Sequence, residues 1–183
     1  MLIELLKRTA ELLNRHKIPY MVIGGQALLI YGEPRFTNDI DITLGVGAER
    51  LDSILEIAKE INLLPAVANP EEFVNQTMVL PMKDKISSYR VDFIFSYTQF
   101  EKGAISRVNI VNLDGIDVAY ASLEDTVIFK LFAGRAKDLD DVQNILLNNE
   151  NINRELIIST LSELGKAVDI DLLSRFKEIE NKI

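Results

Sequence analysis

The sequence contains no cysteine, and this absence excludes several kinds of functional site. Disulfides, thiolate nucleophiles and zinc sites with sulfur ligands are all ruled out. The chain has a single histidine, His16, so no pair of histidines serves acid–base chemistry. No segment has the roughly 20 apolar residues that span a bilayer, and charged residues interrupt the N-terminal stretch at helical spacing, unlike a signal peptide. We therefore expect a cytoplasmic protein without a membrane partner.

Basic residues are also in deficit, with 20 against 28 acidic ones and a formal net charge of −8. A broad nucleic-acid footprint usually shows as a net basic domain, so this balance argues against one. Lys83, Lys85, Arg90 and Arg107 leave two interpretations open. They form a local basic stripe for RNA, or they are scattered over a solvated surface, which the net charge favours.

Hydrophobic periodicity predicts helices and strands in mixed order, followed by helices alone. An Asp-Gly pair at 114–115 indicates a hairpin, and Ser122 with Asp125 indicates a helix start. This order predicts an α+β protein with a mixed sheet, a core over residues 1–121 and a helical part over residues 122–183, or a single domain. Helices are expected at 3–16, 26–31, 48–60, 122–134, 138–148, 153–165 and 169–181, and strands at 20–25, 39–44, 77–82, 90–95, 108–113 and 116–120.

Two carboxylates lie two residues apart on the strand expected at 39–44. Because side chains alternate along a strand, Asp39 and Asp41 point to the same face, about 6.5 Å apart along the chain. That spacing lets both reach around the metal pair of two-metal phosphoryl transfer, and magnesium prefers such oxygen ligands. On its own, however, an Asp-x-Asp pair is also typical of a solvated strand face.

A third carboxylate, Asp92, lies within the apolar run of residues 91–94. Burying an unpaired carboxylate is costly, so this position calls for a partner. If its strand neighbours that of Asp39 and Asp41, a shared metal would be that partner. Asp92 is also the best candidate for a general base, since the chain has no second histidine.

Gly24 and Gly25 lie where a strand is expected to turn into a helix. Without Cβ atoms the backbone can approach a phosphate closely, and the helix start offers free amides with about half a positive charge. A tight turn without a ligand is the alternative interpretation of the pair.

Together these residues resemble the DNA polymerase β-type nucleotidyltransferase superfamily. The likeness covers residues 18–147 and rests on Gly24-Gly25, the segment RFTNDID at 35–41 and the apolar-flanked Asp92. Within the superfamily, the chain is most similar to minimal nucleotidyltransferases and to abortive-infection (AbiEii-type) toxins. A Lys-x-x-Ala element at 130–133 and an Asp-x-x-Asp element at 138–141 add to this likeness. Gly25 departs from the pattern, because many relatives have a serine whose hydroxyl contacts phosphate.

The resemblance implies a function and a set of site residues. It implies transfer of a nucleoside monophosphate from a nucleoside triphosphate to a hydroxyl of a small molecule, protein or RNA, with Mg²⁺ or Mn²⁺. Asp39, Asp41 and Asp92 would be catalytic and hold the metal. The expected nucleotide-binding residues are Gly24, Gly25, Arg35, Thr37, Lys130 and Asp138.

Several of these residues have simpler interpretations. Arg35 is either a surface charge or a bidentate contact to Asp39 or phosphate, and Thr37 favours a local backbone bond. Lys130 is either a phosphate contact or a lysine that snorkels from a core-facing helix. Asp138 and Asp141 are either site residues or a charged first turn of a helix.

Two further functions compete with catalysis. One is a non-catalytic module that binds a nucleotide or a partner with the same fold, although the intact set of three aspartates argues against it. The other is a regulatory half of a toxin–antitoxin complex. The resemblance implies tRNA as the acceptor of such a toxin, and a cognate partner protein as the acceptor of such an antitoxin.

Overall fold

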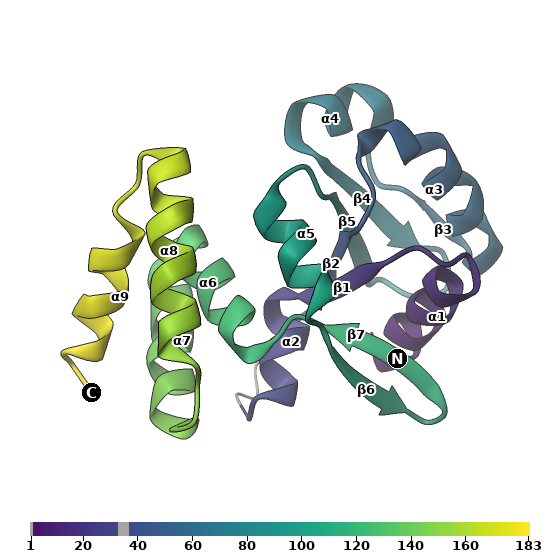
Figure 1. The fold of residues 1–183 in the computed structure, drawn as a ribbon. Helices are drawn as coiled ribbons and strands as arrows, with labels where there is room; N and C mark the ends of the chain where they lie inside the picture. The colour runs from purple at the N-terminus through teal and green to yellow at the C-terminus, as the bar shows by residue number, and fades with distance from the viewer. Residues whose placement is uncertain (1, 33–36) are drawn as a thin grey trace. The chain divides into compact units, whose positions relative to one another are not determined.

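The computed structural model describes residues 2–32 and 37–183. The chain divides into two units (Figure 1). The first comprises Met1–Gln26 and Phe36–Ala121, and the second comprises Ala27–Arg35 and Ser122–Ile183. Among the described helices, none combines the length and the apolar character needed to cross a bilayer.

The first unit is built on a mixed sheet with the strand order β3-β4-β5-β2-β1-β7-β6. The pairs β2–β5 and β1–β7 are parallel, and the other pairs are antiparallel. The strands are β1 (Tyr20–Ile23), β2 (Asp39–Leu44), β3 (Leu63–Pro65), β4 (Val79–Asp84), β5 (Arg90–Phe95), β6 (Asn109–Leu113) and β7 (Ile116–Tyr120). Its helices are α1 (Leu2–Arg15), the start of α2 (Gly24–Ile30), α3 (Leu51–Ala58), α4 (Pro70–Thr77) and α5 (Gln99–Ser106), with 3₁₀ turns at Ala48–Arg50 and Lys59–Ile61.

The central strands β2 and β5 separate an apolar face from a polar one. Ile40, Ile42, Val91 and Phe93 are at most 1% exposed, and each such side chain contributes about 1.5–3 kcal/mol on burial. The residues between them are only partly buried. Because side chains alternate along a strand, the apolar core fixes which face carries the polar residues.

The second unit consists mainly of α6 (Leu123–Ala133), α7 (Ala136–Asn148), α8 (Arg154–Val168) and α9 (Leu172–Glu180). Helix α6 contacts the other three, and α9 contacts α7 and α8 as well (Figure 1). The Ser122 side chain accepts a hydrogen bond from the Asp125 amide and caps α6. The helix ends at Gly134, whose φ of 64° places it in the left-handed region that glycine adopts without strain.

The α+β class with a mixed sheet is confirmed. The strand predicted at 77–82 was displaced, because Thr77 ends α4 and Met78 caps that helix with a φ of 58°. Three elements, β3, α4 and α5, were not predicted at all. Both missed helices carry start signals, since Asn69 caps α4 and Thr98 forms a capping box in α5, as asparagine and threonine often do.

Candidate active site

Strand β2 presents Asp39 and Asp41 on the polar face of the sheet. Strand β5 runs parallel beside it, with Asp92 level with Asp41 and Arg90 level with Asp39. All three aspartates are partly exposed, whereas their strand neighbours Ile40 and Val91 are buried. The structure therefore brings the three predicted carboxylates onto one face of two adjacent strands.

The glycine pair lies directly against this carboxylate row. Ile23, the last residue of β1, pairs with Asp41, and Gly24 follows with a φ of +67°. A Cβ atom at Gly24 would collide with Asp41 Oδ2, and one at Gly25 would lie 3.0 Å from the Thr37 Cβ. Only glycine permits this approach of the backbone to Asp41. Helix α2 has seven residues, so the turn offers free first-turn amides rather than the dipole of a long helix.

The Thr37 side chain is hydrogen-bonded to Asp39. Its hydroxyl lies 2.5 Å from Asp39 Oδ1 and 3.2 Å from the Asp39 carbonyl oxygen. This geometry matches the local bond that the sequence favoured, and it fixes the orientation of the Asp39 carboxylate. Arg35 lies outside the described residues.

Asp92 is the electrostatically perturbed member of the row. Burial raises its pKa and the nearby Asp39 carboxylate raises it further, while Arg90 acts in the opposite direction. An Arg90 guanidinium nitrogen lies 3.8 Å from Asp92 Oδ2. Within the described part of the chain, Asp92 Oδ1 is buried and has no hydrogen-bond partner. An orphaned carboxylate oxygen of this kind is costly, and a cation or a proton relieves the cost.

Two features of the carboxylate row formed by Asp39, Asp41 and Asp92 suit a divalent cation: the type of its ligand atoms and the unpaired oxygen of Asp92. Carboxylate oxygens are the ligands that magnesium prefers, and Asp92 Oδ1 is a buried oxygen of this row with no hydrogen-bond partner among the residues that the structure describes. Among residues 2–32 and 37–183, no three acidic or histidine side chains converge closely enough to hold a metal ion. The three aspartates thus lie on one face of the sheet, with Asp41 and Asp92 opposite each other, but their carboxylates do not converge on one position.

The predicted residues Lys130 and Asp138 lie in the second unit and pair with each other. The Lys130 ammonium donates to Asp138 Oδ1 at 3.0 Å and to Asp141 Oδ2 at 2.7 Å. Lys130 is 6% exposed and Asp138 is fully buried, so this lysine does not snorkel to solvent. Arg135 donates twice more to Asp138, at 2.5 and 3.3 Å. Arg135 was not among the predicted site residues, although its spacing of three from Asp138 is typical of helical ion pairs.

These hydrogen bonds also set the charge state of Asp138. Burial alone would raise its pKa, but the bonds from Arg135 and Lys130 outweigh burial and hold the pKa below its ordinary value. The cluster thus carries two positive and two negative charges that compensate one another, and it ties α6 to α7.

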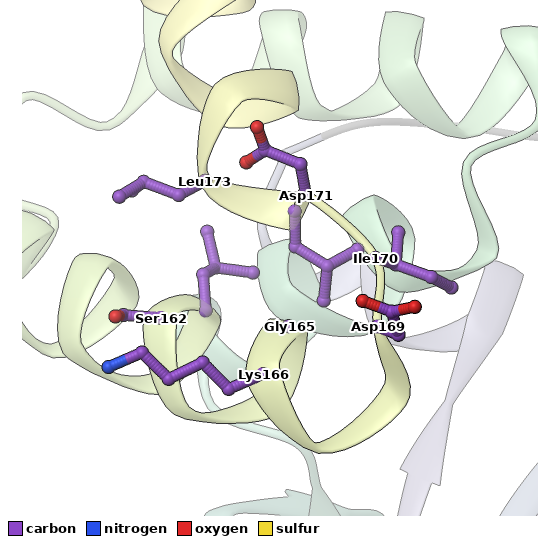
Figure 2. A pocket seen from close by; sticks show the side chains of 9 residues that line it. Ser162, Gly165, Lys166, Asp169, Ile170, Asp171 and Leu173 are labelled. Carbon is purple, nitrogen blue, oxygen red and sulfur yellow. The ribbon is translucent and has the colours of Figure 1, made fainter.

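A pocket of about 480 Å³ lies in the second unit, where α8 turns into α9 (Figure 2). Ser162, Lys166, Asp169 and Asp171 give it a polar rim, and leucine and isoleucine side chains form its walls. None of the site residues predicted from the sequence lines it. Its shape alone therefore gives no reason to assign it to the reaction.

A family model described as nucleotidyltransferase of unknown function (DUF6036) matches residues 1–166. No curated protein matches the sequence closely enough to serve as a relative.

Several solved structures share the fold. An antigenic nucleotidyltransferase-like protein from Paracoccidioides brasiliensis is 20% identical with a TM-score of 0.56, over 95% of this chain and 91% of that one. A putative nucleotidyltransferase from Thermotoga maritima is 16% identical with a TM-score of 0.52, over 79% and 91%. ANT(2″)-Ia in complex with adenylyl-2″-tobramycin is 13% identical with a TM-score of 0.52, over 92% of each chain. At these identities the likeness shows the fold.

Proposed function

Since the chain belongs to the DUF6036 family of nucleotidyltransferases, we propose that it transfers a nucleoside monophosphate from a nucleoside triphosphate to a hydroxyl, with a divalent metal held by Asp39, Asp41 and Asp92. The register of β2 and β5, which sets Asp92 level with Asp41 on one face, carries this proposal. Three carboxylates on adjacent strands supply the oxygen ligands that magnesium or manganese needs.

The reaction replaces one phosphorus–oxygen bond by another. The acceptor oxygen bonds to the α-phosphorus, the bond from that phosphorus to the α–β bridging oxygen breaks, and pyrophosphate leaves. Asp92 would take the acceptor proton, because a metal next to it would lower the pKa of the acceptor hydroxyl and lessen the demand on the base. The metal, when bound, neutralises charge on the triphosphate.

The triphosphate side of the site is the glycine turn. Gly24 and Gly25 let the backbone approach phosphate oxygens beside Asp41, and Thr37 orients Asp39. A nucleotide contact by Arg35, Lys130 or Asp138 stays a prediction from the resemblance. For Lys130 and Asp138, the buried ion pair also supports a structural role.

Asp41→Asn tests the proposal, because it removes a charge and preserves size. A metal worth several kcal/mol in the transition state implies a loss of roughly a thousandfold in transfer, at about 1.4 kcal/mol per decade. The melting temperature should change little, because the variant keeps the size and shape of the side chain at a partly exposed position. Asp52→Asn, on the exposed side of α3, is the matched control and should leave transfer unchanged.

The assay incubates the protein with each labelled triphosphate, magnesium and cell extract, and follows the label into small molecules, RNA and protein. Calorimetry with excess chelator provides a second readout, and equal triphosphate binding without metal would contradict the metal site. Near wild-type transfer by Asp41→Asn would remove this residue from the site. Binding without any transfer would favour the non-catalytic alternative.

The acceptor and the biological role are finer proposals. The adenylyl-2″-tobramycin bound to ANT(2″)-Ia makes a small-molecule acceptor one candidate. A toxin–antitoxin role with tRNA or a partner protein as acceptor stays a prediction from the resemblance. The distribution of label among the three extract fractions separates these cases.

A further inference from the structure

The sheet order separates two sides of the carboxylate row. Strand β1, which ends in the glycine turn, lies on one side of β2, and β5 followed by β4 lies on the other. In an in-line displacement the attacking and leaving oxygens are on opposite sides of the phosphorus. If the triphosphate lies over the glycine turn, the acceptor approaches over β5 and β4. This step rests on the proposed function.

The polar face of β5 and β4 carries a row of two cations next to Asp39. Arg90 is level with Asp39 on β2 and with Lys83 on β4. Both cations are exposed, while Met82, Asp84 and Val91 beside them in sequence are buried, so alternation places Lys83 and Arg90 on one face.

These two cations are close neighbours, and Lys83 has less local compensation than Arg90, which lies opposite Asp39 and next to Asp92. Directly opposed strand residues have Cβ atoms about 5 Å apart, and like charges in this arrangement repel. Within the described residues, no acidic side chain forms an ion pair with Lys83, and Asp92 at 3.8 Å is the one carboxylate paired with Arg90. The sequence favoured scattered charges here, whereas the register brings this pair together.

A cavity of about 730 Å³ lies at the end of the same hairpin, and Lys83 belongs both to this cavity and to the cationic row. Lys83, Lys85 and Ser88 line it together with Ile86, which is 68% exposed. Asp84 also lines it, but Arg8 and the Ser87 hydroxyl already occupy its Oδ2 atom. Ammonium and hydroxyl groups are donors suited to phosphate oxygens, and the volume falls in the range of small-molecule sites.

We propose that the acceptor of this enzyme bears a phosphate group, which Lys83 and Arg90 hold beside the carboxylate row. The chain has a net charge of −8 and therefore repels anions over most of its surface. A local cation pair next to the reacting centre selects an anionic acceptor and disfavours a cationic one such as an aminoglycoside. The phosphate can belong to a polynucleotide or to a small phosphorylated molecule.

Lys83→Ala is the cleaner test, because Arg90 also neighbours Asp92. Two phosphate-bearing probes separate the sources, a labelled RNA hexanucleotide and glucose 6-phosphate, and glucose serves as the uncharged match. Binding is measured with magnesium and a non-hydrolysable triphosphate analogue present, so that the glycine-turn side is filled. Lys83→Arg tests rescue, and Lys59→Ala removes another exposed lysine outside the row.

We expect at least one phosphate-bearing probe to bind, about fivefold more weakly to Lys83→Ala than to the wild type or to Lys59→Ala. If the probe is RNA, the slope of log affinity against log salt should fall by about 0.7 on loss of one contact. Arginine at position 83 should restore binding, and affinity for the triphosphate analogue should be unchanged throughout.

Three outcomes would overturn the phosphate-bearing acceptor. They are no binding of either probe at millimolar concentration, equal binding by Lys83→Ala, or glucose bound as well as glucose 6-phosphate. Each leaves the proposed function standing if the triphosphate analogue still binds with metal. Failure of the wild type to bind that analogue would instead refute the proposed function itself.

Discussion

The buried ion pair of the second unit allows a prediction whose size follows from the structure. Lys130→Met keeps the length and apolar stem of the side chain but removes an ammonium that is hydrogen-bonded to both Asp138 and Asp141. Hydrogen bonds to charged groups contribute about 1.5–3 kcal/mol each, and removing one partner of a buried pair costs about 3–5 kcal/mol. We therefore expect the free energy of unfolding to fall by about 3–5 kcal/mol.

Urea denaturation followed by circular dichroism measures this loss. Lys137→Met, at an exposed position of α7, is the matched control and should change stability by less than about 0.5 kcal/mol. The difference between wild type and Lys130→Met also depends on pH. The Asp138 pKa is lowered in the folded state, so its contribution is present above the unfolded pKa of about 3.9 and disappears as the pH falls through the folded pKa.

The same variant distinguishes the structural role from a nucleotide contact. If Lys130 acts only within the ion pair, magnesium and triphosphate should raise the melting temperature of the wild type and of Lys130→Met by equal amounts. A loss of less than 1 kcal/mol, combined with weaker stabilisation by the triphosphate, would refute the reasoning and assign Lys130 to the nucleotide.

Two further predictions concern the carboxylate face. Gly24→Ala forces a Cβ atom into Asp41 at a residue with a positive φ. The free energy of unfolding should therefore fall by about 1–2 kcal/mol, and the transfer rate should fall as well. Gly115→Ala also places a side chain at a positive φ, but in open space, so it should lose stability and keep its transfer rate. Equal transfer rates for the two variants would contradict the close approach of the Gly24 backbone to Asp41. Asp92→Asn should raise the free energy of unfolding at neutral pH, because burial raises this pKa and the charged form therefore destabilises the fold above the unfolded pKa. That gain should vanish in acid, where Asp92 is protonated in both states, and a pH-independent effect in a urea series would show that the charge is not its cause.

Local sequence determined much of this protein. A period of two placed Asp39 and Asp41 on one strand face, and β2 and β5 have the bounds that their apolar alternation predicts. Ser122 and Gly134 fix the ends of α6 because a capping hydroxyl and a left-handed residue act over a few bonds. The same local physics acts at the starts of α4 and α5, where Asn69 and Thr98 cap the helices, so these two helices are also encoded in the local sequence.

Only the tertiary structure decided which side chains meet across long stretches of chain. No local pattern predicts that β5 pairs parallel with β2. The position of Asp92 opposite Asp41 and of Arg90 opposite Lys83 therefore follows only from the assembled sheet. The pairing of Lys130 with Asp138 likewise depends on how α6 and α7 pack. Strand register and helix packing are set by the combined burial of many apolar side chains from distant parts of the chain. A single segment of sequence does not contain that information.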